Sequence, residues 1–255
     1  MKKHIASILF LFLLSTFQLI AQSHSVKRLG IEQGLSNNYV VSITQDKQGF
    51  LWFATEEGLN KFDGTRFTTY YKNDLTQDNQ GITGNELNRV YADTKHPIIW
   101  IATQRDGLNA YNYNEQTFTA YQHNPENPHS LITNDVTDIA PSTQHDDGLW
   151  ISTYYRGIEY LDITSGQFTH YNKSTVPSLP CDQTWTVLDG GDGNLYIGHV
   201  GSGFSIFSPK DKSVKNFRNE AGNPMSLPGN DVFCIIKDAN GNIWLGTNNG
   251  LALYD

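Results

Sequence analysis

Apolar and polar residues alternate along most of the chain in short runs, which are separated by turns rich in Asp, Asn and Gly. In the first part of the chain these runs cover 40–45, 51–55, 59–62 and 67–70. Alternation with a period of two, together with many β-branched and aromatic residues, predicts β-strands. No stretch has the period expected of a helix of useful length. The pattern therefore predicts an all-β protein.

This pattern of four runs recurs five times, at intervals of about 48 residues. An aromatic residue in the second run marks each copy: Trp52, Trp100, Trp150, Tyr196 and Trp244. The units cover about 36–70, 85–121, 134–171, 181–217 and 230–255. Four short strands per repeat at this spacing are typical of a β-propeller blade. The sequence predicts a β-propeller of about five four-stranded blades over residues 23–255.

The consensus of the repeat is V-x-x-I-x-x-D-x-x-G-x-[LI]-W-[IFL]-x-T-x-x-x-G-[LI]-x-x-[YF]-D, and residues 34–64 form a typical copy. It resembles the two-component regulator propeller repeat, which builds the periplasmic sensor region of hybrid two-component histidine kinases in Bacteroidetes. The resemblance covers about residues 26–255. It implies a sensor of oligosaccharides from polysaccharide breakdown, which signals across the membrane through paired subunits to a kinase and a phosphorelay.

The resemblance also implies more blades than this sequence contains. The family usually has seven blades, and a membrane helix, a kinase and DNA-binding domains follow them. Here the fifth repeat lacks its fourth run. We expect an N-terminal fragment of a longer sensor, incomplete or open relative to a seven-bladed propeller. The alternative is a closed five-bladed ring in which residues 26–30 supply the missing strand.

The first 22 residues have the layout of a secretory signal peptide. Lys2 and Lys3 precede an uncharged apolar run over 5–20, and the small residue Ala21 follows it. The alternative is an uncut membrane anchor, but the run is shorter than a spanning helix requires. We predict a signal peptide at 1–22 and export to the periplasm. No later segment is apolar enough to span a membrane.

The composition narrows the possible functions. The formal net charge of −8 disfavours contact with nucleic acid or anionic lipid. Two cysteines are too few for a disulfide scaffold or a zinc site built from several thiolates. We find no motif for a nucleotide, metal or hydrolase site. We therefore predict no catalytic residues, no metal and no cofactor in this chain.

Candidate ligand contacts come from the loops between the second and third runs. Chain direction alternates from strand to strand, so these loops share one rim of the propeller with the linkers between blades. Loops on a rigid scaffold commonly carry binding residues. Aromatic faces beside amides, carboxylates and guanidinium groups suit a sugar ligand. The candidates for ligand contact are Tyr154, Tyr155, Arg156, Arg105 and Asp106.

Three functions follow from this interpretation. The first is the ligand-sensing propeller segment of a hybrid two-component sensor, without chemistry of its own. An oligosaccharide ligand and homodimerisation in the full-length context are then expected. The second is a stand-alone secreted binding protein, either a lectin or an interaction scaffold. The third is a polysaccharide lyase, for which only Tyr155, Arg156 and Arg105 lie near one rim.

Overall fold

The computed structural model describes residues 26–73 and 81–254, which form five β-sheets in chain order. The first four sheets have four strands each, and the fifth has three strands among the described residues. Blades 1 and 2 contain β1 (Val40–Gln45), β2 (Leu51–Thr55), β3 (Gly58–Phe62), β4 (Phe67–Tyr70), β5 (Leu87–Ala92), β6 (Ile98–Thr103), β7 (Leu108–Asn112) and β8 (Thr117–Tyr121). Blades 3, 4 and 5 contain β9 (Val136–Pro141), β10 (Gly148–Thr153), β11 (Gly157–Asp162), β12 (Gln167–Tyr171), β13 (Thr184–Asp189), β14 (Leu195–His199), β15 (Phe204–Phe207), β16 (Val214–Phe217), β17 (Val232–Lys237), β18 (Ile243–Thr247) and β19 (Gly250–Tyr254). The predicted all-β propeller blades are confirmed.

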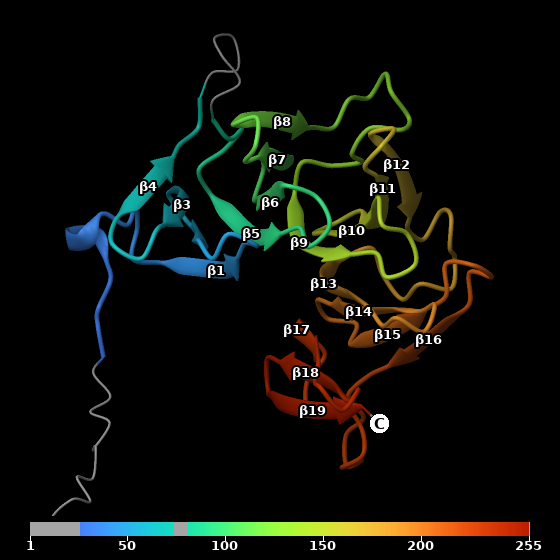
Figure 1. Ribbon diagram of the computed structural model, residues 1–255. Helices are drawn as coiled ribbons and strands as arrows, with labels where there is room; N and C mark the ends of the chain where they lie inside the picture. Colours follow the sequence, from blue (N-terminus) through green and yellow to red (C-terminus); the bar gives the residue numbers. More distant parts are fainter. Residues whose placement is uncertain (1–25, 74–80, 255) are drawn as a thin grey trace, which may run out of the picture.

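The blades follow one another around an arc, with β1, β5, β9, β13 and β17 on its inner side (Figure 1). Every pairing within a blade is antiparallel, and neighbouring strands are consecutive in the chain. The one helical element among the described residues is a short 3₁₀ turn, η1 (Ile31–Gln33), ahead of blade 1.

Closure by the N-terminal segment, the alternative expectation, is wrong for this structure. Residues 26–30 belong to no strand, and the sheet of β17, β18 and β19 has no fourth member among the described residues. Blades 1 and 5 lie at the two ends of the arc (Figure 1). Ile43 on blade 1 and Leu251 on blade 5 are accordingly 58% and 65% exposed. The predicted signal peptide at 1–22 lies outside the described residues.

The core lies between the blades and is built in the same way four times. The face of one blade that carries the marker Trp or Tyr packs against an aliphatic face of the next blade. Between blades 1 and 2, for example, fully buried Trp52 and Leu59 lie in one cluster with Ile99 and Ile101. These aromatic residues are therefore structural, and their burial is a main source of stability.

Carboxylates in the turns between the first two strands orient these aromatic side chains. Asp46 accepts hydrogen bonds from Gln48 N and Phe50 N at 2.9 and 3.0 Å, and from Trp52 Nε1 at 2.7 Å. In blade 3 the turn position of Asp46 is taken by Ser142, whose hydroxyl accepts from Gln144 N and His145 N, and Trp150 Nε1 donates instead to Asp189 of blade 4 at 3.2 Å. In both blades a single Asp carboxylate thus links a turn to the indole N–H of the buried Trp.

Candidate functional site

The loops between the second and third strands lie beside the linkers that lead into each blade, as predicted. The first amide of each loop donates to a carbonyl just before the first strand of its own blade. The pairs are Glu56 N to Tyr39 O, Gln104 N to Glu86 O, Tyr154 N to Asp135 O, Val200 N to Gln183 O and Asn248 N to Asp231 O. These five loops and the linkers form one continuous rim.

Four of the five loops are closed by the same pair of residues, whereas in blade 4 His199 replaces the Thr and its backbone N donates to Gly203 O at 2.9 Å. Thr55, Thr103, Thr153 and Thr247 donate their hydroxyl to the carbonyl of the glycine that starts the third strand, at 2.7–2.9 Å. That glycine has a positive φ, which is 84° at Gly157, and a side chain would be strained there. Because this frame holds these four loops in the same way, the residues between Thr and Gly can vary.

A β-bulge distorts the first strand of every blade close to this rim. The pairing of β13 with β14, for instance, runs from Thr184↔His199 directly to Thr186↔Gly198, so Trp185 has no partner. The same shift leaves one extra residue in each blade: Val41, Asn88, Thr137, Trp185 and Phe233. A bulge turns its extra side chain away from the regular pleat.

In blades 2 and 3 the bulged side chain is polar and binds the next blade. Asn88 Nδ2 donates to Val136 O at 2.8 Å. The Thr137 hydroxyl donates to Thr184 O at 3.4 Å, and it lies 3.0 Å from the Ser152 hydroxyl. Both carbonyls belong to the first residue of the following blade's innermost strand. The side chains at these two positions therefore hold adjacent blades together.

In blades 4 and 5 the bulged residue is aromatic. Trp185 and Phe233 meet edge to face with ring centroids 5.6 Å apart. Trp185 also meets Tyr154 from the loop of blade 3 at 6.0 Å, and Tyr154 meets Tyr155 at 4.1 Å. We call these four residues, Tyr155, Tyr154, Trp185 and Phe233, the aromatic row. It crosses three blades, and Tyr155 and Phe233 are 53% and 44% exposed.

Next to this row lies a hollow of about 330 Å³ between the loops of blades 2 and 3. We call it the arginine hollow, and its lining residues are Arg105, His123, Ile132, Thr133, Asn134, Asp135 and Arg156. Burial raises the pKa of Asp135, and the neighbouring Arg105 guanidinium partly opposes that rise. The neighbouring Tyr154 hydroxyl raises the pKa of Tyr155.

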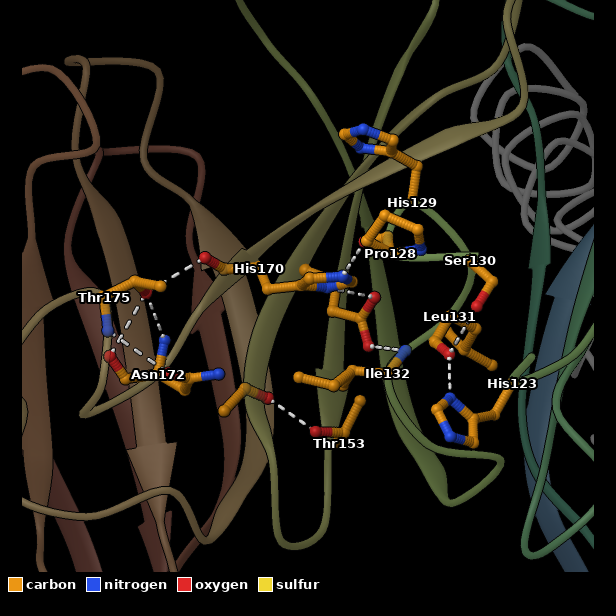
Figure 2. A network of polar contacts seen from close by, with 12 residues as sticks. His123, Pro128, His129, Ser130, Leu131, Ile132, Thr153, His170, Asn172 and Thr175 are labelled. Atoms are coloured by element: carbon orange, nitrogen blue, oxygen red, sulfur yellow. Dashed lines mark hydrogen bonds and ion pairs between the residues drawn. The ribbon is translucent and has the colours of Figure 1, made fainter. Parts of the chain in front are cut away.

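One wall of the arginine hollow is the linker before blade 3, and a buried carboxylate holds it in place (Figure 2). Glu159 is fully buried on β11, and its Oε1 accepts a hydrogen bond from Ile132 N at 2.9 Å. Its Oε2 lies 3.1 Å from His170 Nδ1, and His170 Nε2 lies 2.9 Å from Pro128 O. His123 Nδ1 lies 2.8 Å from Leu131 O. The linker is therefore anchored at three points.

Blades 1 and 2 anchor their linkers with an amide instead. Asn60 Oδ1 accepts from Ser36 N at 2.9 Å, and Asn109 Oδ1 accepts from Thr83 N at 3.0 Å. Blade 3 uses a carboxylate at this position. The Glu159 carboxylate raises the pKa of His170, whereas burial raises the pKa of Glu159 itself. Both shifts favour the protonated form of their group, and Asn60 and Asn109 in blades 1 and 2 carry no titratable proton at this position.

The structure brings four of the five predicted contact residues to this region. Tyr154 and Tyr155 belong to the aromatic row, and Arg105 and Arg156 line the arginine hollow. Asp106 instead lies 3.4 Å from Lys72 Nζ, beside the linker of blade 2. Whether any of the five contacts a ligand stays a prediction.

Sequence reasoning missed Trp185 and Phe233. A comparison of the repeats at this one column could have found them, because Val, Asn and Thr fill it in the other blades.

Other kinds of site receive no support from the described part of the chain. Residues 26–73 and 81–254 contain no group of three or more His, Cys, Asp or Glu side chains that could hold a metal ion. No helix among these residues is long and apolar enough to cross a membrane. The two cysteines are free thiols, with Cys181 Sγ 3.5 Å from His199 Nδ1.

Comparison with known sequences identifies the repeat. The model of the two component regulator propeller matches residues 34–57 and 226–249, in blades 1 and 5. This chain carries two-component regulator propeller repeats. It is 42% identical over 66 residues, 26% of its length, to histidine kinase P4 from Formosa agariphila. The aligned part is 5% of that kinase.

Two solved structures extend the likeness to almost the whole chain. The extracellular domain of the hybrid two component system BT3049 from B. thetaiotaomicron is 68% identical, with a TM-score of 0.84 over 90% of this chain. That of BT4673 from the same organism is 23% identical, with a TM-score of 0.71 over 91% of this chain, and shows the shared fold. The chain spans 30% and 32% of the length of these two relatives. It is thus homologous to part of an extracellular sensor domain.

Proposed function

We propose that this two-component regulator propeller is the ligand-sensing segment of a hybrid two-component sensor, and that it works in the periplasm. Identity of 68% to an extracellular domain of such a system, over 90% of this chain, is the observation that carries the proposal. The proposed ligands are oligosaccharides released from polysaccharides. The proposed role is binding, and phosphoryl transfer belongs to other domains of the full-length protein.

The rim supports a sugar ligand through its chemistry. Sugar rings present flat C–H faces that pack on aromatic rings, and hydroxyl groups that need directional hydrogen bonds. The aromatic row offers the first, and the loop residues beside it offer the second. The scaffold below is rigid, because every loop is bonded to its linker and four of the five are closed by Thr and Gly. A preformed site loses little entropy on binding.

A direct test measures binding to the whole chain by isothermal titration calorimetry. The panel contains three-unit oligosaccharides of galacturonic acid, galactose, arabinose and xylose. We expect at least one to bind, and replacing Trp185 by Ala to weaken that binding about tenfold or more. Tyr71→Ala is the matched control, because Tyr71 is half exposed on blade 1 and outside the aromatic row. Equal loss in both variants, or no binding across the panel, would contradict the proposal.

The same samples test the absence of catalysis. The wild-type chain is incubated with the galacturonic acid oligosaccharide, the member of the panel from which elimination can form an unsaturated uronate, and the absorbance of that product is followed. We expect no increase over a protein-free control. A steady increase that disappears in Tyr155→Phe would support a lyase in place of a sensor segment.

A further inference from the structure

The arginine hollow contains two positive charges in an acidic protein. The formal net charge of the chain is −8, so its field repels anions in general. Arg66 and Arg89 are each paired with a carboxylate, Asp63 at 3.2 Å and Asp138 at 3.0 Å. Within residues 26–73 and 81–254, Arg105 and Arg156 have no carboxylate within ion-pair distance. Both line the same hollow.

The surroundings of these two side chains are fixed by the backbone. Arg105 lies in the loop whose Gln104 N donates to Glu86 O at 2.8 Å, and Arg156 in the loop whose Tyr154 N donates to Asp135 O at 3.2 Å. The linker between the loops is held by Glu159. Two guanidinium groups thus project from anchored loops on neighbouring blades. Such groups bind carboxylate and sulfate oxygens with paired, charge-assisted hydrogen bonds.

The other polar groups of the hollow are compatible with an anion. Leu131 O accepts from His123 Nδ1, so Nδ1 carries a proton and Nε2 is the ring nitrogen left for another partner. Asp135 is the one carboxylate that lines the hollow, against two guanidinium groups. A volume of about 330 Å³ is at the lower end for ligand sites, which suits one sugar unit.

We propose that the arginine hollow binds the carboxylate or sulfate group of an acidic sugar unit, while the aromatic row carries the neighbouring units. The proposal rests on the proposed function and narrows it, because it makes the ligand an anionic oligosaccharide. Arg105 and Arg156 then determine specificity, and the aromatic row provides affinity that does not depend on charge.

The test compares ligands that differ in charge alone. Trigalacturonate and its fully methyl-esterified form are titrated into the whole chain at low and at moderate salt. We expect wild type to prefer the charged form at least tenfold, with a preference that falls as salt rises. The double variant Arg105→Gln, Arg156→Gln should lose the preference and keep its affinity for the ester. Arg66→Gln on the opposite rim is the matched control, and thermal unfolding confirms that each variant is folded.

A second measurement separates this inference from the proposed function. Inorganic sulfate is titrated into protein labelled with ¹⁵N-arginine, and the side-chain Nε–H signals are followed. Saturable shifts confined to Arg105 and Arg156 support the anion site even if no oligosaccharide binds, an outcome that would contradict only the sugar ligand. Comparison of the sulfate titration with the trigalacturonate titration also shows whether the hollow prefers a sulfate or a carboxylate group. Equal binding of the charged and esterified trisaccharides by wild type would overturn the inference and leave the proposed function standing.

Discussion

Blades 2 and 3 and blades 4 and 5 use the same backbone irregularity for different purposes. In the first pair the bulged residues Asn88 and Thr137 bind the carbonyls of the following blade. In the second pair Trp185 and Phe233 pack on each other and remain partly exposed. The fold therefore requires the bulge but not a particular side chain on it. A position that stabilises one half of the rim is available for recognition in the other half.

The largest expected effect compares two Trp→Ala variants, one in the core and one in the aromatic row. It tests whether the loss in unfolding free energy depends on where the ring lies. Trp52→Ala should lower the free energy of unfolding by about 3–5 kcal/mol, because Trp52 is fully buried and bonded to Asp46. Trp185→Ala should cost less than about 1.5 kcal/mol, since the ring is only half-buried. Urea unfolding followed by fluorescence measures both. Equal losses would show that Trp185 is a core residue.

An exchange of side chains between the two halves tests recognition directly. The double variant Trp185→Asn, Phe233→Thr gives blades 4 and 5 the residues of blades 2 and 3. We expect affinity for the best oligosaccharide of the panel to fall about tenfold to a hundredfold, which is about 1.4–2.7 kcal/mol. Calorimetric titration measures the change. Unaltered affinity in a folded variant would place the ligand elsewhere.

A third prediction concerns the pair of Glu159 and His170, which occupies in blade 3 the place of Asn60 and Thr69 in blade 1. The Glu159 carboxylate raises the pKa of His170 above its usual value of 6.5. Because the pKa of His170 is higher in the folded state than in the unfolded state, protonation stabilises the folded state at pH below 6.5. This contribution is lost as the pH rises through the folded-state pKa. Unfolding free energy should therefore decrease between pH 6 and pH 8.5, by at most about 1.4 kcal/mol per pH unit.

The matched variant for this pair is Glu159→Asn with His170→Thr, which reproduces Asn60 and its cross-strand partner Thr69 of blade 1. It should remove the part of this pH dependence that comes from His170 and keep the bond to Ile132 N, whereas the part from His96, whose pKa is also raised beside Asp93 and Asp147, should remain. Urea unfolding at several pH values provides the comparison. An unchanged pH profile in the variant would assign the effect to other groups.

The smallest expected effect belongs to the polar half. Asn88→Ala removes one hydrogen bond to Val136 O, and this should lower the unfolding free energy by about 1 kcal/mol. Oligosaccharide affinity should stay within about twofold, because Asn88 lies outside the aromatic row. Unfolding and titration of one preparation give both numbers. A large loss of affinity with no loss of stability would reverse the roles assigned to the two halves.

Much of the fold could be predicted from the sequence because the repeat is local. Alternation defined the strands, and the spacing of Trp52, Trp100 and Trp150 defined the blades. The position of the loops on one rim followed from alternating strand direction alone. These features depend on residues close together in the chain, or on an exact repeat of them.

The rest depends on how strands pair and on contacts between blades. The bulge at Trp185 cannot be detected in the alternation of apolar and polar residues around it. From the sequence alone, Trp185 is therefore interpreted as an ordinary strand residue. The bond from Trp150 to Asp189 joins different repeats, because Ser142 stands in blade 3 where Asp46 stands in blade 1. The pairing of Asp106 with Lys72 likewise crosses from one linker to the next loop. Such contacts join different repeats and can be identified only once the blades are placed side by side.

The bulge also bears on how such proteins diversify. Each repeat carries one side chain near the rim, at the second position of its first strand, whose identity the blade core does not dictate. Duplication or recombination of a repeat would move that side chain together with its own supporting turn, strand pairing and linker anchor. New combinations of rim residues could then arise by shuffling whole repeats, without the repacking that a new pocket in a single continuous core would demand. Each repeat of the arc is thus a unit that can be exchanged together with its rim residue.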